Sequence, residues 1–293
     1  MKSRNWTARS LRAAMFTSIL LLAGALSAET ITGTVKNMTT GKPAAGDDVV
    51  LLTLTQGMNE TGRTKTDAQG KFSLNVTDSG VPHMVRVNHQ GVNYFPSGGP
   101  VMPGVSSVDI QVYDAAKSLD AITTSIQVMR LQSDGSSLQV VELIAVKNDS
   151  KPPRSLMNDR PYEFYLPDGA QVDGADAQAP GGMPVNTAPV PDQGGKYYFV
   201  FPLRPGETRF QIGYHLPYSG QISLQPKVAG SMQHFALVMP KTMQFQAKVE
   251  GTYAPMNDDS GQSNIQVATD VNPTKDLSFQ ISGTGMLDRK SVV

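Results

Sequence analysis

Alternation of apolar and polar residues with a period of two is the feature that most constrains the fold of this sequence. Three segments alternate over their whole length: 209–216, 243–250 and 277–282. A period of two places successive side chains on opposite faces of a strand, so each segment predicts a strand with one buried and one solvated face. No segment has a sustained period of 3.6, and we therefore expect few helices.

Two further segments, 138–146 and 197–201, are apolar on both faces and predict central strands or strands covered on both sides. Short patterned runs are separated by many of the 27 glycines and 20 prolines. This combination favours an all-β fold made of β-sandwiches over an α/β fold. Specifically, we expect an N-terminal seven-stranded β-sandwich followed by a second β-sandwich region.

The first 28 residues have the pattern of a secretory signal peptide. An uncharged, largely apolar stretch, 13–26, follows four basic residues and ends in small ones, with cleavage predicted near Ser27 or Ala28. The basic residues are Lys2, Arg4, Arg9 and Arg12. An uncleaved anchor is the alternative, but the apolar run is short against the roughly 20 residues of a spanning helix. The sequence predicts export to the periplasm or cell envelope.

Removal of the leader makes the chain mildly acidic. The sequence has 25 basic and 25 acidic residues, and the leader contributes four basic ones, which leaves 21 against 25. A net charge of about −4 argues against nucleic acid as a partner. Since the sequence has no cysteine, disulfides, thiolate metal sites, a Cys nucleophile and a lipidated Cys are all excluded.

Composition divides the rest of the chain into two β regions. The first, 29–114, contains seven strand-like runs: 30–37, 48–55, 61–66, 71–76, 83–88, 92–95 and 106–112. A polar connector, 115–120, has room for one helical turn. The second region, 121–285, is one or two subdomains and contains a Gly/Pro/Ala/Asp-rich segment, 172–195, that we expect to be a long loop, either functional or loosely ordered.

The C-terminal residues, 286–293, end without a closing strand or cap. We expect a tail that is truncated or that leads to a further segment. No apolar stretch after the leader approaches membrane-spanning length, so a membrane tether would require a segment absent from this chain.

The first β region carries a recognisable pattern. The residues that carry it are Gly33, Val35, Thr40, Gly41, Pro43, Gly46, Gly62, Arg63, Thr64, Thr66, Asp67, Ala68, Gly70, Phe72 and Leu74. This pattern closely resembles the carboxypeptidase regulatory-like domain, a transthyretin-like (prealbumin-like) seven-stranded sandwich. The resemblance covers under a third of the chain. It implies a non-catalytic domain and lowers the expectation of an enzyme.

A second, weaker resemblance continues through 85–95, which includes His89, Gly91, Tyr94 and Phe95. This stretch is similar to a variant found in bacterial, notably acidobacterial, envelope proteins. In those proteins a less characterised β region follows, and often a C-terminal membrane segment.

The same residues also have local explanations. Thr40 to Pro43 is a turn sequence, in which Gly41 is free to take a positive φ. In 67–70, the Asp67 side chain is placed to accept backbone hydrogen bonds. We therefore interpret Asp67 as a turn former rather than as a catalytic acid.

The four histidines give no catalytic or metal-binding pattern. His83, His89, His215 and His234 lack zinc-site spacing, and we expect each to be on the surface or partly packed, with His215 on a solvated strand face. No nucleophile elbow or phosphate-binding loop is present. The sequence therefore predicts no catalytic, cofactor-binding or metal-ligating residues, and no cofactor.

Two acidic clusters and two aromatic clusters remain. Asp47–Asp48 and 257–259 are interpreted as solvated turns; the second lacks the ligand spacing of a calcium loop. Tyr94–Phe95 and 197–199 are interpreted as core aromatics rather than as stacking platforms for sugars, because they lie in or beside strand-like runs.

The function expected from the sequence is that of a non-catalytic, exported cell-envelope protein. It would act as a structural or binding module for an envelope protein or polysaccharide, and strand addition at a sheet edge is one physical route to such contacts. The alternatives are a carbohydrate-binding or uptake-associated protein and an envelope hydrolase.

Overall fold

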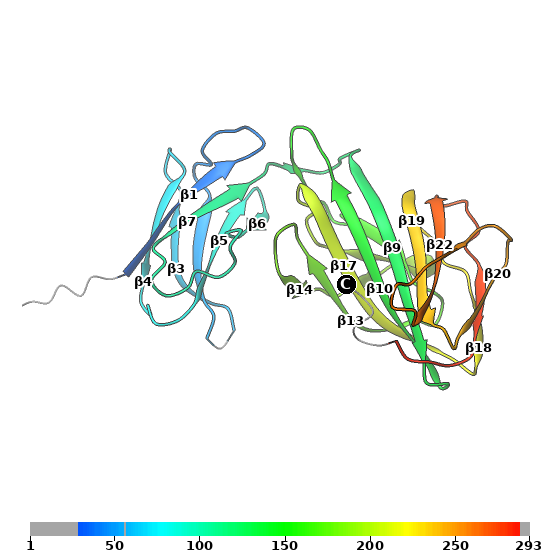
Figure 1. Ribbon diagram of the computed structural model, residues 1–293. Coiled ribbons are helices and arrows are strands. Elements are labelled where there is room, and N and C mark those ends of the chain that lie inside the picture. The colour runs from blue at the N-terminus through cyan, green and yellow to red at the C-terminus, as the bar shows by residue number, and fades with distance from the viewer. Residues whose placement is uncertain (1–28, 56, 288–293) are drawn as a thin grey trace, which may run out of the picture.

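The computed structural model describes residues 29–55 and 57–287, and within them the fold is all-β (Figure 1). The elements are strands β1 to β23 and one short 3-10 turn, η1 (Gln193–Gly195). The fold class predicted from the period-two alternation is confirmed. The predicted leader, 1–28, and most of the predicted tail lie outside the described residues.

The first domain consists of two facing sheets. Their strand orders are β4-β1-β7 and β3-β2-β5-β6. The strands are β1 (Glu29–Asn37), β2 (Asp48–Thr53), β3 (Asn59–Lys65), β4 (Lys71–Val76), β5 (His83–His89), β6 (Val92–Tyr94) and β7 (Ser107–Val112). Each strand overlaps one of the seven runs predicted from the sequence. Their inward side chains form one core that includes Val35, Leu51 and Phe72.

Two motif residues of this domain have clear structural reasons. The ring of Phe72 packs directly over Gly33, where an added Cβ would collide with the ring and with the Val108 carbonyl. Asp67 accepts backbone hydrogen bonds from Gln69 (2.9 Å) and Lys71 (2.8 Å). The interpretation of Asp67 as a turn former is confirmed.

The second domain is built on one eight-stranded mixed sheet, ordered β14-β13-β17-β10-β9-β19-β22-β21. Its strands are β9 (Ile122–Ser133), β10 (Ser137–Asn148), β13 (Gln171–Gln178), β14 (Pro184–Asn186), β17 (Gly206–Pro217), β19 (Met232–Pro240), β21 (Ala254–Met256) and β22 (Ser263–Val271). A single hydrophobic core spans this sheet. The region predicted as one or two subdomains is therefore one domain.

Two small sheets cover the same face of the large sheet. One has the order β12-β16-β15, with β12 (Tyr162–Tyr165), β15 (Val190–Pro191) and β16 (Lys196–Phe199); the other has the order β18-β23-β20, with β18 (Gln221–Leu224), β20 (Gln244–Ala247) and β23 (Phe279–Ser282). Phe199 of β16 stacks on Phe210 of β17, with ring centroids 4.5 Å apart. At the other side, Tyr253 contacts both Phe279 of β23 and Phe235 of β19. The two small sheets thus lie over different strands of the large sheet.

The prediction of a long loop over 172–195 is wrong. This segment contributes β13, β14 and β15, and β13 pairs with β17 along its length. Ala175 and Ala177 are buried and alternate with Asp176 and Gln178, so the period of two is present but is carried by small side chains. The period of two was missed because alanine contributes little apolar surface, so the segment has the composition of a loop.

The connector, which has room for a helical turn, begins instead with a short strand. β8 (Ala115–Ala116) is extended and pairs in parallel with β11 (Ser155–Leu156). The backbone N–H of Ser155 donates to the Asp114 carbonyl (3.0 Å), and that of Met157 donates to the Ala116 carbonyl (2.9 Å). The connector therefore finds its hydrogen bonds on a neighbouring strand and does not need a helix.

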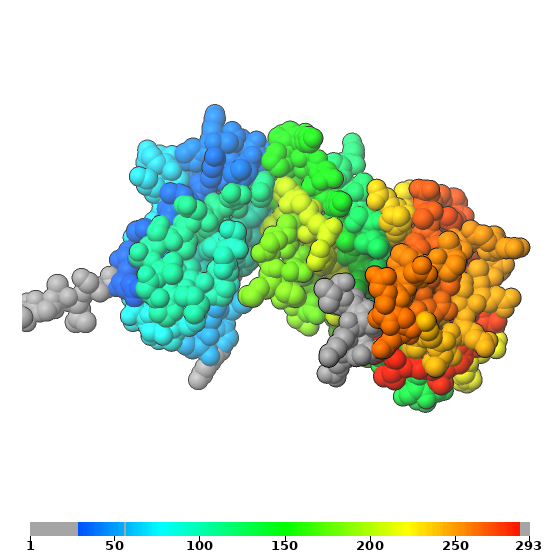
Figure 2. Space-filling view, viewed as in Figure 1, coloured from blue at the N-terminus to red at the C-terminus, as the bar shows by residue number. Residues whose placement is uncertain are grey.

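The two domains are in direct contact at this connector, as Figure 2 shows where the blue and cyan surface meets the green surface.

Within the described ranges, 29–55 and 57–287, there is no helix with the length and apolar character needed to cross a membrane.

Candidate ligand-binding site

A cleft in the second domain opens between the two small sheets and reaches the inner face of the large sheet. Its volume is about 240 Å³. The walls come from the ends of β12 and β18 and the segments that follow them, and the floor comes from β9, β10 and β17. The lining residues are Gln127, Met129, Glu142, Tyr165, Leu166, Pro167, Asp168, Tyr214, Ile222, Ser223, Leu224, Gln225, Pro226 and Lys227.

Glu142 occupies a core position at the floor of this cleft. It lies in the middle of β10, between the buried residues Val140 and Ile144 on the same strand face. Its cross-strand neighbours are Met129 on β9 and Ile212 on β17. All four neighbours are apolar, and Glu142 itself is 1% exposed. A charged residue thus stands where the strand pattern calls for an aliphatic one.

Two neighbouring side chains hold the Glu142 carboxyl group. The Gln127 amide donates a hydrogen bond from Nε2 to Oε1, and the Tyr214 hydroxyl donates to Oε2 at 3.2 Å. Gln127 comes from β9 and Tyr214 from β17, the two strands that flank β10. Each carboxyl oxygen therefore accepts one hydrogen bond from the protein.

Burial dominates the electrostatics of this site. It raises the pKa of Glu142 from 4.5 to about 7, while the hydrogen bonds from Gln127 and Tyr214 oppose the rise. Burial and the adjacent carboxyl group raise the pKa of Tyr214 well above its ordinary value, so this hydroxyl keeps its proton. Within the part of the chain that the structure describes, no lysine, arginine or histidine forms an ion pair with Glu142.

The walls and rim of the cleft are of mixed character. Its apolar side chains include Met129, Leu166 and Leu224, all of which are buried. Asp168 and Lys227 are exposed at the rim and carry opposite charges. A small cleft of mixed polar and apolar lining, with a buried carboxyl group of strongly raised pKa at its floor, is a candidate binding or active site.

A second polar cluster lies at the contact between the domains. His89, 7% exposed, is held between two carboxylates: its Nδ1 is 2.8 Å from Asp47 Oδ2 and its Nε2 is 3.1 Å from Asp114 Oδ1. Asn37 also donates to Asp114 Oδ1, at 2.7 Å. The hydrogen bond with Asp47 is the main cause of a raised His89 pKa, which burial partly opposes. Burial alone would raise the pKa of Asp114, but hydrogen bonds from His89 and Asn37 lower it.

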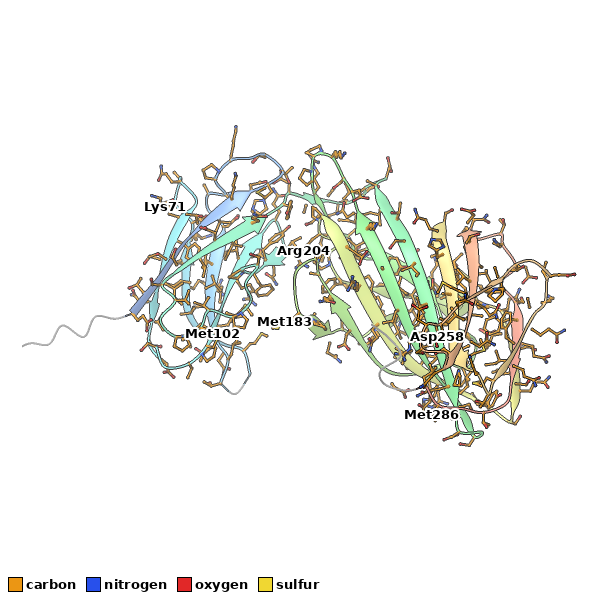
Figure 3. The ribbon with its side chains drawn as sticks, in the orientation of Figure 1. Lys71, Met102, Met183, Arg204, Asp258 and Met286 are labelled. Carbon is orange, nitrogen blue, oxygen red and sulfur yellow. The ribbon has the colours of Figure 1, made fainter. Side chains whose placement is uncertain are left out.

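Further contacts brace the same junction. The Tyr94 hydroxyl donates to the Tyr113 carbonyl and lies 2.8 Å from Ser155 Oγ. Arg204, which Figure 3 places between the domains, donates from Nη2 to the Asn93 carbonyl at 2.6 Å and stacks over the Tyr94 ring at 5.4 Å. These contacts join the two sandwiches in one arrangement, so we assign the His89 cluster a structural role.

The structure revises two of the histidine predictions. His83 and His89 are buried, at 3% and 7% exposure, rather than superficial. His215 lies on the outer face of β17 and pairs with Asp173 at 2.9 Å, so its predicted solvated position is confirmed. His234 is exposed.

One of the two acidic clusters behaves as predicted. The Asp258 carboxylate accepts hydrogen bonds from the backbone N–H groups of Ser260, Gln262 and Ser263, as a turn former does. The interpretation of Asp47 as part of a solvated turn is wrong, because its carboxylate is turned inward to His89.

The aromatic clusters divide between core and surface. Tyr94 and Phe199 are buried, at 4% and 0% exposure, and Tyr197 packs against the core. Tyr198 is half-buried beneath the Arg160 guanidinium, at 4.8 Å, and Phe95 is 42% exposed. Core packing is confirmed for Tyr94, Tyr197 and Phe199 but not for Phe95 or Tyr198.

Gln127, Glu142 and Tyr214 were not predicted as site residues from the sequence. One feature of the sequence does mark the position of this cleft: Glu142 is a charged residue at an inward position of the apolar run 138–146. Among the described residues, no group of three or more His, Asp or Glu side chains is placed to hold a metal ion.

Comparisons with known proteins do not identify a family for this chain. No family model matches the sequence, and no curated protein matches it. A solved structure, that of an M1 zinc metallopeptidase from Deinococcus radiodurans, has 12% identity and a TM-score of 0.32, covering 57% of this chain and 43% of that one. The chain thus spans less than half the length of that protein, and a likeness of this degree carries no argument about activity.

Proposed function

We propose that this chain is a non-catalytic, exported protein of the cell envelope, with a carboxypeptidase regulatory-like first domain and a second domain that binds a partner. The observation that carries the proposal is the Glu142 cleft. A buried carboxyl group without a cationic partner destabilises a core, so its presence at the floor of a cleft points to a ligand.

The neighbours of Glu142 favour binding over catalysis. Gln127 has no titratable group, and Tyr214 keeps its proton, so neither accepts a proton from the carboxyl group. The arrangement fixes the carboxyl group as a hydrogen-bond acceptor and provides no relay for a reaction.

The size of the cleft limits what enters it. A volume of about 240 Å³ lies below the range of ordinary drug-sized sites and admits one projecting group. The partner is therefore an envelope protein that inserts a side chain, or a polysaccharide that inserts a sugar residue. The contacts of Tyr94 and Arg204 at the domain junction hold the first domain against the second.

Affinity capture from an envelope extract tests the proposal. The mature chain is expected to retain a specific component that a Glu142→Gln chain retains at least tenfold less. Asp168→Asn is the matched control, because it removes an exposed carboxylate at the rim of the same cleft. Equal retention by the wild type and Glu142→Gln would contradict a role for the cleft, and no retention by any of the chains would contradict a binding function.

Two further measurements test the remaining parts of the proposal. N-terminal sequencing of the protein recovered from the periplasm is expected to begin near residue 28 or 29, whereas recovery of the intact leader would contradict cleavage. A panel of ester, amide and glycoside substrates is expected to show no turnover. Metal-dependent hydrolysis that is lost on His89→Ala or His215→Ala would replace binding with an enzymatic function.

A further inference from the structure

We propose that the group recognised at the floor of the cleft is a primary ammonium carried on a short aliphatic chain. This inference rests on the proposed binding function and deepens it, because it names the chemistry of the ligand. It follows from the hydrogen-bonding state of Glu142, the missing counter-charge and the character of the walls.

The hydrogen bonds of Glu142 select a ligand group that donates rather than accepts. Gln127 and Tyr214 occupy one acceptor position on each carboxyl oxygen, and a carboxylate oxygen has two. Glu142 is 1% exposed, so a ligand reaches the remaining acceptor positions only at the floor of the cleft, and the group that binds there is an N–H or O–H donor. A ligand carbonyl, carboxylate or phosphate has no proton to donate and does not fit this site.

A bound cation would supply the counter-charge that Glu142 lacks in its ionised form. With Gln127 and Tyr214 both donating, the hydrogen bonds favour the ionised carboxyl group, whereas burial opposes ionisation. An opposite charge within about 4–6 Å would resolve this conflict, and no cationic side chain in the described ranges supplies it through an ion pair with Glu142. A bound cation would compensate the charge that the protein leaves uncompensated.

Ammonium fits this position better than guanidinium. The cation has to lie in about 240 Å³, beside two donors that already contact the carboxyl group. An ammonium is a compact charge with rotatable donors, whereas a guanidinium needs a flat face across both oxygens. Met129, Leu166 and Leu224 provide apolar surface for an alkyl chain that leads from the ammonium to the rim.

Two charged side chains face the entrance. Asp168 attracts a cation, and Lys227 repels one; both are exposed, so solvent screens their influence. Glu142 at the floor therefore decides the affinity. Since the ligand binds the ionised carboxyl group, its affinity is expected to fall about tenfold for each pH unit below the Glu142 pKa of about 7.

Calorimetric titration of the mature chain with n-butylamine and n-butanol tests the inference, since the two probes have the same alkyl chain and differ in charge. At pH 8, butylamine is expected to bind at least tenfold more tightly than butanol. Glu142→Gln should abolish this preference, while Asp168→Asn should change the affinity for butylamine less than about threefold. Equal binding of the two probes, equal binding by Glu142→Gln, or tighter binding of butylguanidine would overturn the inference.

Two further probes identify the source of the ammonium. Nα-acetyl-lysine methylamide represents a lysine side chain, which carries its ammonium on an aliphatic chain, and glucosamine represents an amino sugar, which carries it on a ring. Tighter binding of Nα-acetyl-lysine methylamide is expected, and tighter binding of glucosamine or no binding of either overturns the inference. Capture of an envelope component that depends on Glu142, without any ammonium binding, would overturn the ligand chemistry and leave the binding function intact. Ammonium binding without capture would contradict the envelope partner and leave this site intact.

Discussion

Replacing Glu142 with glutamine is expected to raise the free energy of unfolding at neutral and alkaline pH. Burial raises the pKa of Glu142 from 4.5 to about 7, so the unfolded chain releases this proton at lower pH than the folded chain does. As the pH rises from 4.5 to about 7, the free energy of unfolding therefore falls, and the loss is complete above pH 7. Glutamine has no ionisable group, so the free energy of unfolding of the variant does not fall in this way as the pH rises.

The size of the expected change in the free energy of unfolding follows from the difference between the ordinary Glu142 pKa of 4.5 and its pKa of about 7 in the folded protein. At about 1.4 kcal/mol for each pH unit, it corresponds to about 3 kcal/mol of lost stability at pH 8. The glutamine amide keeps the shape of the carboxyl group and offers one oxygen to Gln127, while the Tyr214 hydroxyl turns to accept from the new NH₂ group. Allowing for some loss of hydrogen-bond quality, we expect a gain of about 1–3 kcal/mol.

Chemical denaturation at pH 5 and pH 8, followed by far-UV circular dichroism, measures this gain. The excess of the Glu142→Gln free energy of unfolding over that of the wild type is expected to be larger at pH 8 than at pH 5. Asp168→Asn, which changes an exposed carboxylate at the rim of the same cleft, is the matched control. A stability difference between Glu142→Gln and the wild type that is the same at both pH values would refute the electrostatic reasoning.

Three other substitutions test the packing and the domain junction. His89→Gln should destabilise the protein more at pH 5.5 than at pH 8.5 in thermal unfolding, because a raised pKa gives stability below 6.5 that is lost as the pH rises through the folded value; an equal effect at both pH values would contradict this. Phe199→Ala, which removes the ring stacked on Phe210, should cost about 3–5 kcal/mol in chemical denaturation, and a cost below about 1 kcal/mol would contradict a central packing role. Arg204→Ala removes the bond to the Asn93 carbonyl and should increase the radius of gyration in small-angle X-ray scattering; an unchanged radius would show that the junction does not depend on it.

Much of the fold was predictable because its signal is local. The alternation of Phe210, Ile212, Tyr214 and Leu216 gives both the strand and its buried face. The failure over 171–178 has an equally local cause, since alternating alanines carry the period without the apolar surface that makes it visible.

The polar clusters were not predictable in the same way, because they form between distant segments. Gln127 and Tyr214 lie 15 and 72 residues from Glu142 in the sequence. Asp47 and Asp114 lie 42 and 25 residues from His89. Gln127, Glu142 and Tyr214 come together only because β9, β10 and β17 pair in the sheet. A charged residue within an apolar run marks the position of such a site but does not identify its partners.

Titration of the Glu142 carboxyl group by ¹³C NMR, in the presence and absence of butylamine, tests the ligand-binding account most directly. In the free protein, the carboxyl group is expected to titrate with a pKa of about 7. Saturating butylamine should lower this pKa by about one unit or more, because a bound cation stabilises the ionised form, while butanol should leave it unchanged. A Glu142 pKa that is the same with and without butylamine would contradict the assignment of the cleft as a site for a cationic ligand.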